Sequence, residues 1–392
     1  MVRLGDICTK ITDGSHNPAQ GIPHSEYLML SSKNIYDDEI TLDNPRYLSA
    51  ENYATENKRT QISTGDILLT IVGTVGRAAV VSDSYKNICL QRSVAVIKPK
   101  SSLIDSRFLM YQLQSMRTHL EQEARGVAQK GIYLKQVENL QVKVPSMDEQ
   151  FRVVKKLDKV SELIALRKEQ LAKLDQLVKS RFVELFGDPT ANPMGWAKVN
   201  ITAVVGGKVS NGFFAKRDDY CDDGNVKVLG VAHVVNRMYS NIGELPRTNG
   251  TEVDVAKYGV KYGDMLFCRS SLVAEGIGKA SIVPKETPNN VLFECHVIRL
   301  PLDLDKCVPE FMQVLSTTDY FRNQVIAQSK TATMTTIGQD GILKTEIILP
   351  PLDLQKKFLK FVEQTDKSKL AIQHSLDKLE LLKKTLMQEY LG

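Results

Sequence analysis

Polar side chains that can read the edges of DNA bases recur in this sequence where turns are expected. Arg and Lys suit guanine, Asn and Gln suit adenine, and Ser, Thr and His are more flexible partners. In the first part of the chain the candidates, with one neighbouring aromatic residue, are Ser15, His16, Asn17, Lys33, Asn34, Arg77, Gln91, Arg92, Gln129, Lys130 and Tyr133. In the second part they are Asn211, Phe213, Lys216, Arg217, His233, Asn236, Arg269, Ser270, Ser271, Lys279, His296, Lys330, Thr333 and Thr335. Any one of these residues would ordinarily be just a solvated side chain in a loop. The prediction of a DNA interface therefore rests on the whole set.

The sequence does not indicate a catalytic centre. The glycine loop at residues 73–77 resembles a phosphate-binding loop, but it lacks the GxxxxGK[ST] pattern and leads into an expected strand, so a tight turn is the better interpretation. The stretch DNPRY at residues 43–47 resembles part of an amino-group methyltransferase signature, but it has only one proline and no partner glycine motif for S-adenosylmethionine. We therefore predict no catalytic residue in this chain.

The cysteines do not suggest a metal site. They are scattered, with no CxxC pair and no close histidine, at Cys8, Cys89, Cys221, Cys268, Cys295 and Cys307. Metal sites need ligands at closer and more regular spacing. We expect reduced, mostly buried thiols, no bound metal and no cofactor held by this chain.

Composition limits the class of protein only loosely. The 392 residues carry a formal net charge of +5, and 42% of them are hydrophobic, which is ordinary for a globular protein. No part of the chain is strongly basic, so a DNA-binding surface would have to be a local patch. No apolar run approaches the roughly 20 residues of a membrane span, and no leader is apparent at the start, so we expect a cytoplasmic protein without a membrane partner.

The elements that must position the candidate side chains occur twice. Residues 150–187 and 355–392 align without a gap at a constant offset of 205, with identities such as Gln150/Gln355. Apolar residues in each copy alternate steps of four and three, which is typical of a heptad seam on a long helix. The seam positions are Val153, Leu157, Val160, Ile164, Arg167, Leu171, Leu174 and Val178 in the first copy, and Phe358, Val362, Thr365, Lys369, Ile372, Leu376, Leu379 and Lys383 in the second.

These helices are predicted to pair with each other. Polar residues interrupt both seams, and a polar seam residue costs stability but restricts register and partner. At about 1.5 Å per residue each helix would be roughly 55–60 Å long, too long to be buried inside a globular part, so a spacer role is expected. Prolines before each copy prevent the helix from extending upstream, and Gly187 is an expected helix end.

The two globular parts, residues 1–146 and 195–351, show the same order of expected elements. In the first part, strands are expected at residues 27–30, 67–72, 78–81 and 87–98, and one helix at 106–123. Residues 262–266 correspond to 64–68, 275–280 to 74–79, Phe311 to Phe108, and 337–349 to 132–144. The frame recurs while the loops differ, a pattern expected when one scaffold carries two different binding surfaces.

Taken as a whole, the chain resembles the specificity subunits of type I restriction–modification systems. The resemblance is carried by VPSMDEQ before the first helix, LFGDP after it, LPPLDLQ before the second helix, and local motifs at residues 11–16, 73–77 and 126–132. The second globular part departs at residues 330–334 and has four extra residues around 271–275.

The resemblance implies an α+β fold with a pseudo-twofold internal repeat. It implies two similar mixed α/β target recognition domains separated by two long helices packed as an antiparallel coiled coil. The expected boundaries are recognition domains at residues 1–146 and 195–351, spacer helices at 147–187 and 352–392, and a linker at 188–194.

The resemblance also implies the function and partners. Each recognition domain would read one half of an asymmetric bipartite site in double-stranded DNA, and the chain itself would be non-catalytic. Two methyltransferase subunits carrying S-adenosylmethionine would dock on the helices and methylate adenine, and restriction subunits would bring ATP and Mg. The alternatives are a coiled-coil adaptor without DNA recognition and, less favoured by the motifs, a self-sufficient nuclease or methyltransferase.

Overall fold

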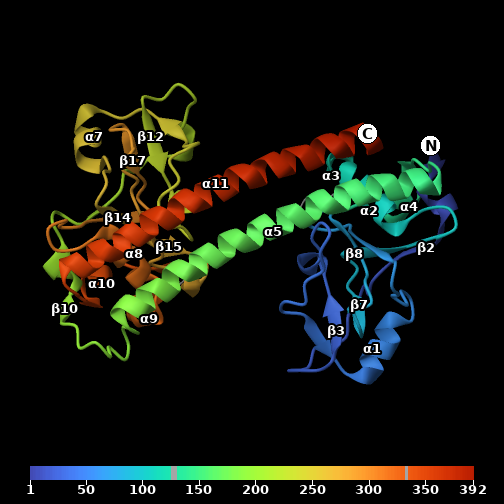
Figure 1. The fold of residues 1–392 in the computed structure, drawn as a ribbon, viewed down its shortest axis with the longest axis horizontal. Coiled ribbons are helices and arrows are strands. Elements are labelled where there is room, and N and C mark those ends of the chain that lie inside the picture. The colour runs from blue at the N-terminus through green and yellow to red at the C-terminus, as the bar shows by residue number, and fades with distance from the viewer. Residues whose placement is uncertain (125–129, 332–333) are drawn as a thin grey trace. The chain divides into compact units, whose positions relative to one another are not determined.

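The computed structural model describes residues 1–124, 130–331 and 334–392 (Figure 1). The chain divides into two compact units: unit 1 contains residues 1–169 and 373–392, and unit 2 contains residues 170–372. Each unit combines a globular part with segments of the same two long helices, α5 (Met147–Phe186) and α11 (Leu352–Leu391). None of the helices described is both long and apolar enough to cross a membrane.

Unit 1 is built on small sheets with short helices around them. A four-stranded antiparallel sheet has the order β2 (Cys8–Asp13), β8 (Val94–Pro99), β5 (Ile67–Thr70) and β6 (Ala78–Val80). A three-stranded sheet has the order β4 (Arg46–Leu48), β3 (Tyr27–Leu30) and β7 (Ile88–Leu90), and β3 and β7 are parallel. The remaining elements are β1 (Val2–Arg3) paired with β9 (Gln141–Val142), η1 (Leu4–Ile7), η2 (Ser32–Asn34), α1 (Ala50–Asn57), α2 (Ser106–Ser115), α3 (Arg117–Glu123) and α4 (Leu134–Glu138).

Unit 2 repeats this plan with additions. Its four-stranded sheet has the order β11 (Ser210–Asn211), β18 (Val297–Pro301), β14 (Asp264–Cys268) and β16 (Ala280–Ile282), and its three-stranded sheet has the order β13 (Arg247–Thr248), β12 (Val226–Leu229) and β17 (Val291–Phe293). A further small sheet of β15 (Ser270–Ser271), β20 (Thr335–Thr336) and β19 (Lys330–Thr331) is added, and β10 (Lys198–Asn200) pairs with β21 (Glu346–Ile348). The helices are η3 (Ile201–Val204), η4 (Arg217–Asp219), α6 (Val231–Val234), α7 (Glu252–Tyr258), η5 (Ala274–Gly276), α8 (Pro309–Ser316), α9 (Asp319–Ala327) and α10 (Gln339–Leu343).

The internal repeat is confirmed at the level of single hydrogen bonds. Asp66 lies directly before β5, and Asp264 is the first residue of the equivalent strand β14. Each caps the preceding turn: Asp66 accepts from Ser63 N at 2.8 Å, and Asp264 accepts from Lys261 N at 3.0 Å. After these strands the predicted correspondence of residues 275–280 with 74–79 is wrong by one residue. Leu69 lies opposite Ala78 and Phe267 lies opposite Ala280, so the offset grows from 198 to 202. The four extra residues lie in the segment around β15 and η5, as predicted.

Two expected elements of unit 1 are each broken in two. Residues 87–98, expected as one strand, form β7 and β8, because the Gln91 amide donates to the carbonyl of Leu30 at the end of β3 and the Arg92 amide donates to the carbonyl of Ser15, at 2.9 Å each. Residues 106–123, expected as one helix, form α2 and α3, because the backbone leaves the helical region at Met116, whose ψ is 4°. Both breaks come from contacts or local geometry that apolar periodicity does not encode.

In unit 1 the two long helices lie side by side and run antiparallel, as Figure 1 shows. Lys168 forms an ion pair with Glu380 at 3.4 Å, and Lys156, twelve residues earlier, donates to the hydroxyl of Tyr390, ten residues later, at 2.8 Å. Lys383, a polar seam residue, forms an ion pair with Asp38 of the globular part. The antiparallel arrangement is therefore confirmed, and Lys383 attaches the helix to the sheet-containing region.

In unit 2 the helices pair in the same sense around an aromatic cluster. The ring centroids of Phe182 and Phe358 are 5.8 Å apart, and Lys369 forms an ion pair with Asp175 at 2.6 Å. This cross-helix pair supports the predicted role of Lys369 in selecting register, whereas Thr365 only donates to a carbonyl of its own helix. None of the predicted seam positions in either helix is exposed, so the seams face inward as expected.

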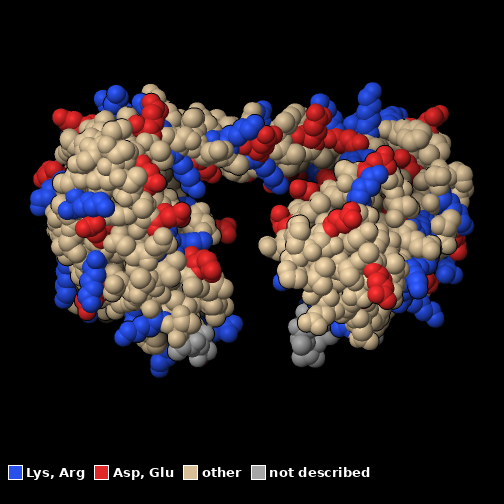
Figure 2. Space-filling model, turned by 90° about the horizontal axis from the view of Figure 1, so that it is seen from below, with Lys and Arg blue, Asp and Glu red and all other residues tan. Residues whose placement is uncertain are grey.

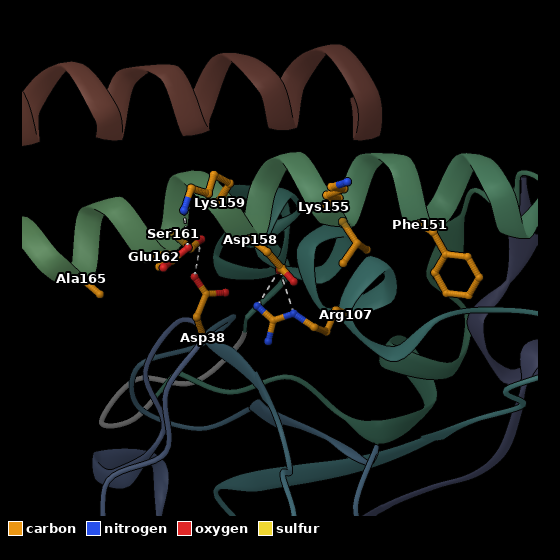
Figure 3. Close-up of a pocket in the computed structure, with 10 residues that line it drawn as sticks. Asp38, Arg107, Phe151, Lys155, Asp158, Lys159, Ser161, Glu162 and Ala165 are labelled. Atoms are coloured by element: carbon orange, nitrogen blue, oxygen red, sulfur yellow. Dashed lines mark hydrogen bonds and ion pairs between the residues drawn. The ribbon is translucent and has the colours of Figure 1, made fainter.

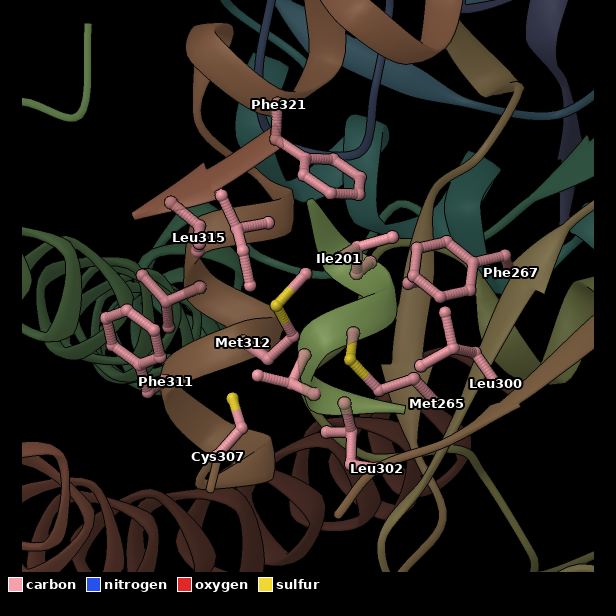
Figure 4. Packing of buried hydrophobic residues seen from close by; sticks show 14 of the residues in the cluster. Ile201, Met265, Phe267, Leu300, Leu302, Cys307, Phe311, Met312, Leu315 and Phe321 are labelled. Carbon is pink, nitrogen blue, oxygen red and sulfur yellow. The ribbon is translucent and has the colours of Figure 1, made fainter. Parts of the chain in front are cut away.

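The core of unit 2 joins the helices to the four-stranded sheet. Phe186 of α5 packs against Phe311 of α8 with ring centroids 4.8 Å apart. Figure 4 shows Met312 of α8 and Met265 of β14 pointing into the same packed region. Because the long helices contribute to this core, they are part of the folded unit and not only a connection.

A repeated glutamine attaches the start of each long helix to its globular part. Gln150 is fully buried, and its Oε1 accepts from Asp105 N at 2.8 Å while its Nε2 donates to Pro145 O at 2.9 Å. Gln355 makes the matching bonds, from Val308 N at 2.9 Å and to Pro350 O at 2.8 Å. The identity found in the sequence repeat is thus explained by a shared structural role.

Candidate nucleic-acid interface

In unit 1 the candidate loops meet at one edge of the sheets. The strands β2, β3, β5 and β7 all end there, and β8 begins there. Backbone hydrogen bonds tie the loops together: Ser15 N donates to Leu90 O at 2.8 Å, Ile71 N to Ser93 O at 2.9 Å, and Ile132 N to Ile71 O at 2.9 Å. We call the segments 14–17, 31–34, 71–77, 91–93 and 130–133 the loop edge of unit 1.

Unit 2 builds the same edge with the same bonds. Phe213 N donates to Phe293 O at 2.7 Å, and Glu294 N donates to Leu229 O at 3.0 Å. Arg269 N donates to His296 O at 2.8 Å, matching the bond from Ile71 to Ser93 in unit 1. The segments 211–213, 230–233, 269–271, 294–296 and 335–337 form the loop edge of unit 2. The backbone frame is therefore shared, and the side chains that it presents differ.

Most candidates of unit 1 are accessible on or beside this edge. The exposed ones are His16, Asn17, Lys33, Arg92, Lys130 and Tyr133, and the half-buried ones are Ser15, Arg77 and Gln91. His16 is held by Asp13 at 2.8 Å, and the guanidinium of Arg77 lies over the ring of Tyr36 at 4.9 Å from its centroid. Gln129 lies outside the residues that the structure describes.

The candidates of unit 2 are more often engaged in local bonds. Lys216, Arg217, Asn236, His296 and Lys330 are exposed, and Asn211, Phe213, His233, Arg269, Ser270, Ser271 and Lys279 are half-buried. The guanidinium of Arg269 donates to Cys295 O at 3.1 Å, and His296 Nδ1 lies 3.2 Å from Ser270 Oγ. Thr335 is buried with its hydroxyl 3.0 Å from that of Thr331, and Thr333 lies outside the described residues.

Two candidates hold the frame together. Asn34 is buried, accepts from Ser31 N at 3.0 Å through Oδ1, and donates to Asp43 O at 2.9 Å through Nδ2. His233 occupies the same place in unit 2 and accepts from Gly230 N at 3.1 Å through Nδ1. A buried amide whose bonds are all internal has no group left for a base, so we omit Asn34 from the proposed DNA contacts.

The loop edge of unit 2 also carries apolar side chains that the sequence reasoning missed. Leu272 is 83% exposed and Val273 is 59% exposed, directly after β15. Both lie in the four-residue insertion, and that insertion is the sequence signal that could have drawn attention to them. Apolar groups of this kind can contact the methyl group of thymine.

Polar contacts fix α5 to the globular part of unit 1 beside a cavity of about 640 Å³. Figure 3 shows Arg107 directed at Asp158, with 2.7 Å between them, and Asp38 directed at Ser161, with 3.0 Å between the oxygens. The hydroxyl of Tyr111 also donates to Asp158 at 2.8 Å, and burial raises the pKa of that hydroxyl. These side chains bond to one another, so they attach α5 to the globular part of unit 1. None of the residues named is arranged for catalysis.

Charged side chains of both signs are mixed on the surface, and the thiols are free. Figure 2 shows Lys and Arg interspersed with Asp and Glu on the visible face of each unit. No group of three or more potential metal-ligating side chains occurs in residues 1–124, 130–331 and 334–392. The six cysteines, all of them described, are free, and four of them are buried, as expected.

The comparison with protein families decides the identity. The family model described as type I restriction modification DNA specificity domain matches residues 1–176 and 193–382. The chain belongs to this family. The two matches cover the two halves of the internal repeat, so each half is a specificity domain of the family.

Individual relatives agree with the family. Over 179 residues the chain is 32% identical to the EcoBI type I restriction enzyme specificity subunit of Escherichia coli, an alignment that covers 44% of this chain and 37% of the length of that relative. Over 348 residues it is 22% identical to the MjaVIII specificity subunit of Methanocaldococcus jannaschii, covering 84% of this chain and 79% of that protein.

Solved structures share the fold. The crystal structure of a type I restriction–modification S subunit from M. genitalium aligns with a TM-score of 0.53 at 12% identity, covering all of this chain and 95% of that one. A structure from a study of complex assembly in the type I restriction–modification system aligns with a TM-score of 0.50 at 17% identity, covering all of this chain and 96% of that one. The α+β architecture with an internal repeat expected of the family is thus confirmed.

Proposed function

We propose that this chain is the DNA-recognition subunit of a type I restriction–modification complex and that each unit reads one half of an asymmetric bipartite site in double-stranded DNA. The observation that carries the proposal is the pair of loop edges. They share the backbone hydrogen bonds named above, yet Gln91, Arg92 and Ser93 in unit 1 correspond to Glu294, Cys295 and His296 in unit 2. Different side chains on one frame are expected to select different bases.

The partners are proposed from the family. Two methyltransferase subunits, which hold S-adenosylmethionine and methylate adenine, dock on α5 and α11, and restriction subunits supply ATP-dependent cleavage with Mg. The relatives are named as specificity subunits of restriction enzymes, which supports this assignment. The chain itself is proposed to contribute recognition and no catalytic group, and to act in the cytoplasm, where its DNA target lies.

Methylome sequencing tests the proposal directly. A host that carries this gene with its modification partner should contain a bipartite methyladenine motif that disappears when the gene is deleted. Replacing the three residues 91–93 should change the bases in one half of the motif and leave the other half unchanged. Persistence of every bipartite motif after deletion would contradict the proposal.

The rival function is a coiled-coil adaptor that joins other proteins without contacting DNA. It is distinguished by binding to duplex DNA in the presence of the partner subunits. Sequence preference together with a salt-dependent affinity favours DNA recognition, because phosphate contacts release counterions. Affinity that depends on neither sequence nor salt favours the adaptor.

A further inference from the structure

A cavity of about 400 Å³ in unit 2 gathers positive charge where the globular part meets both long helices. Five cationic side chains and one acidic side chain line it. The cations are Lys179 of α5, Lys369 of α11, Arg322 of α9, Arg237 after α6, and Lys279 before β16. The acid, Asp175, is already engaged, because it forms an ion pair with Lys369 at 2.6 Å.

Three of the other cations of this cavity, Lys279, Arg237 and Arg322, have neutral partners. Lys279 Nζ donates to Asn236 Oδ1 at 2.7 Å, and the guanidinium of Arg237 donates to the carbonyl of Val235 at 3.2 Å. Arg322 donates through Nη2 to Glu275 O at 3.1 Å, whereas its Nη1 is buried without a hydrogen-bond partner among the described residues. The cavity therefore has donors and positive charge for an anion that none of the residues described in unit 2 supplies.

The end of α8 does not neutralise these cations, although Val314, Ser316 and Thr317 line the cavity. The hydroxyl of Thr317 donates to Val314 O at 2.7 Å, and that of Ser316 donates to Gln313 O at 2.6 Å. The C-terminus of a helix carries only about half a negative elementary charge, so it offsets little of the charge of five cations.

In unit 1, at the equivalent position, acidic side chains of the chain itself pair with the cations. A glutamine of α2, Gln114, donates to Ala78 O at 2.9 Å and to Asp38 at 3.0 Å, and this locates the loop of residues 36–39. That loop supplies two acids: Asp37 pairs with Arg117 at 2.5 Å, and Asp38 pairs with Lys383.

In unit 2 the equivalent loop lacks the acids. Gln313 of α8 donates to Ala280 O at 3.3 Å and to Arg237 O at 3.1 Å, and this locates the loop of residues 235–238 in the same position. The loop supplies Asn236 and Arg237 in place of the two aspartates. Arg322, like Arg117 in unit 1, lies beside the turn glycine, but its hydrogen-bond partner is the backbone carbonyl of Glu275 and, among the residues that the structure describes, not a carboxylate. In unit 1 Arg117 and Lys383 thus pair with acids of the loop, whereas in unit 2 Lys279, Arg237 and Arg322 have neutral partners.

We propose that this cavity binds a backbone phosphate of the DNA beside the half-site read by unit 2. The inference rests on the proposed function. Lys279 connects the cavity to the loop edge, because its carbonyl accepts from Cys268 N at 2.8 Å, one residue before Arg269. Lysine and arginine together provide the charge and the fork of donors that a phosphate takes. The role assigned to Lys279 is therefore contact with phosphate in place of the base contact predicted from the sequence.

A phosphate contact has a thermodynamic signature that differs from base reading. Removing a phosphate contact weakens binding to all sequences by a similar factor, because phosphates carry no sequence information. Each phosphate neutralised contributes about 0.9 to the slope of log K against log salt concentration. Lys279→Gln should therefore lower affinity roughly five- to twenty-fold for matched and mismatched duplexes alike, and reduce the salt slope by about one.

The experiment uses the full chain with its modification subunits and a duplex that carries the motif found by methylome sequencing. Affinity is measured over a range of salt concentrations for wild type, Lys279→Gln, Lys179→Gln and the control Lys208→Gln. Lys208 is exposed and lies two residues before β11, whose partner strand β18 runs away from the loop edge. The control should leave both the affinity and the salt slope unchanged.

A methylphosphonate scan then locates the phosphate. Neutralising one backbone position beside the second half-site should weaken binding by wild type and have no further effect on Lys279→Gln. An unchanged salt slope in both Lys279→Gln and Lys179→Gln, or a loss confined to matched duplexes, overturns the inference while wild type still binds specifically. Failure of wild type to prefer any sequence is a separate result, which refutes the proposed function itself.

Discussion

The buried amide of Gln150 offers the sharpest test of how a recognition unit is attached to its helix. Its Oε1 accepts from Asp105 N at 2.8 Å, and its Nε2 donates to Pro145 O at 2.9 Å and Leu103 O at 3.1 Å. Gln150→Met keeps the length of the side chain and removes all three bonds. The equivalent change in the other repeat, Gln355→Met, removes two.

The magnitude follows from the groups that lose a partner. Leu103 is 43% exposed, so water can replace its bond, whereas Asp105 N and Pro145 O lie against the buried amide. A buried polar group without a partner costs about 1–3 kcal/mol, so the two groups together should cost about 3 kcal/mol. For a unit of this size that corresponds to a fall in Tm of roughly 6–12 °C.

Scanning calorimetry of the full chain measures the effect. The control is Gln176→Met, an exposed position on the same helix, which should change the free energy of unfolding by less than about 0.5 kcal/mol. If Gln150→Met and Gln355→Met are as stable as Gln176→Met, the glutamines do not attach the helices as argued here.

Three further predictions concern recognition and pH. Arg92→Ala, at an exposed position on the loop edge of unit 1, should relax base preference in one half of the methylated motif only, as read by methylome sequencing. Burial raises the pKa of the Glu310 carboxyl, so the folded state binds its proton more tightly, and the free energy of unfolding should fall as pH rises above the ordinary pKa of 4.5. Glu310→Gln should remove that part of the dependence in urea unfolding at several pH values. Burial opposes ionisation of Asp38, but the charge of Lys383 and the hydrogen bonds from Lys383, Gln114 and Ser161 together outweigh it and lower the pKa. Ionised Asp38 therefore stabilises the fold above pH 3.8, and this contribution is lost as pH falls. Asp38→Asn should therefore destabilise unit 1 by about 2 kcal/mol near pH 7 and have little effect in acid, and equal losses at both pH values would contradict this.

Sequence reasoning succeeded where the signal was local and repeated. The offset of 205 located both long helices, and the prolines and Gly187, whose φ is +76°, explain where they start and stop. It failed where a contact from elsewhere interrupts a regular pattern. The run at residues 87–98 alternates like one strand, yet the turn at 91–93 divides it between two sheets, and that turn presents Gln91 and Arg92 at the loop edge.

For the candidate site, residue type predicted which loops form the interface as a group, but it did not predict which single side chains are accessible. Asn34 and Asn17 are the same residue type in neighbouring loops, but one is buried and bonded to the backbone while the other is exposed. Likewise, Arg322 of α9 was not among the candidates, and it shares a cavity with Lys279 because the fold places it beside the turn glycine Gly278.

The sequence by itself determined the duplication, the seams and the limits of the long helices. It also determined that the two globular parts carry corresponding loops, because all of these depend on spacing along the chain. Tertiary structure alone decided which polar side chains remain available for a ligand. That outcome depends on whether a donor or a charge meets an internal partner: Arg117 meets Asp37 in unit 1, whereas Arg322 forms no ion pair with an acid among the described residues of unit 2. Such partners lie far apart in sequence, so their pairing is set by the fold.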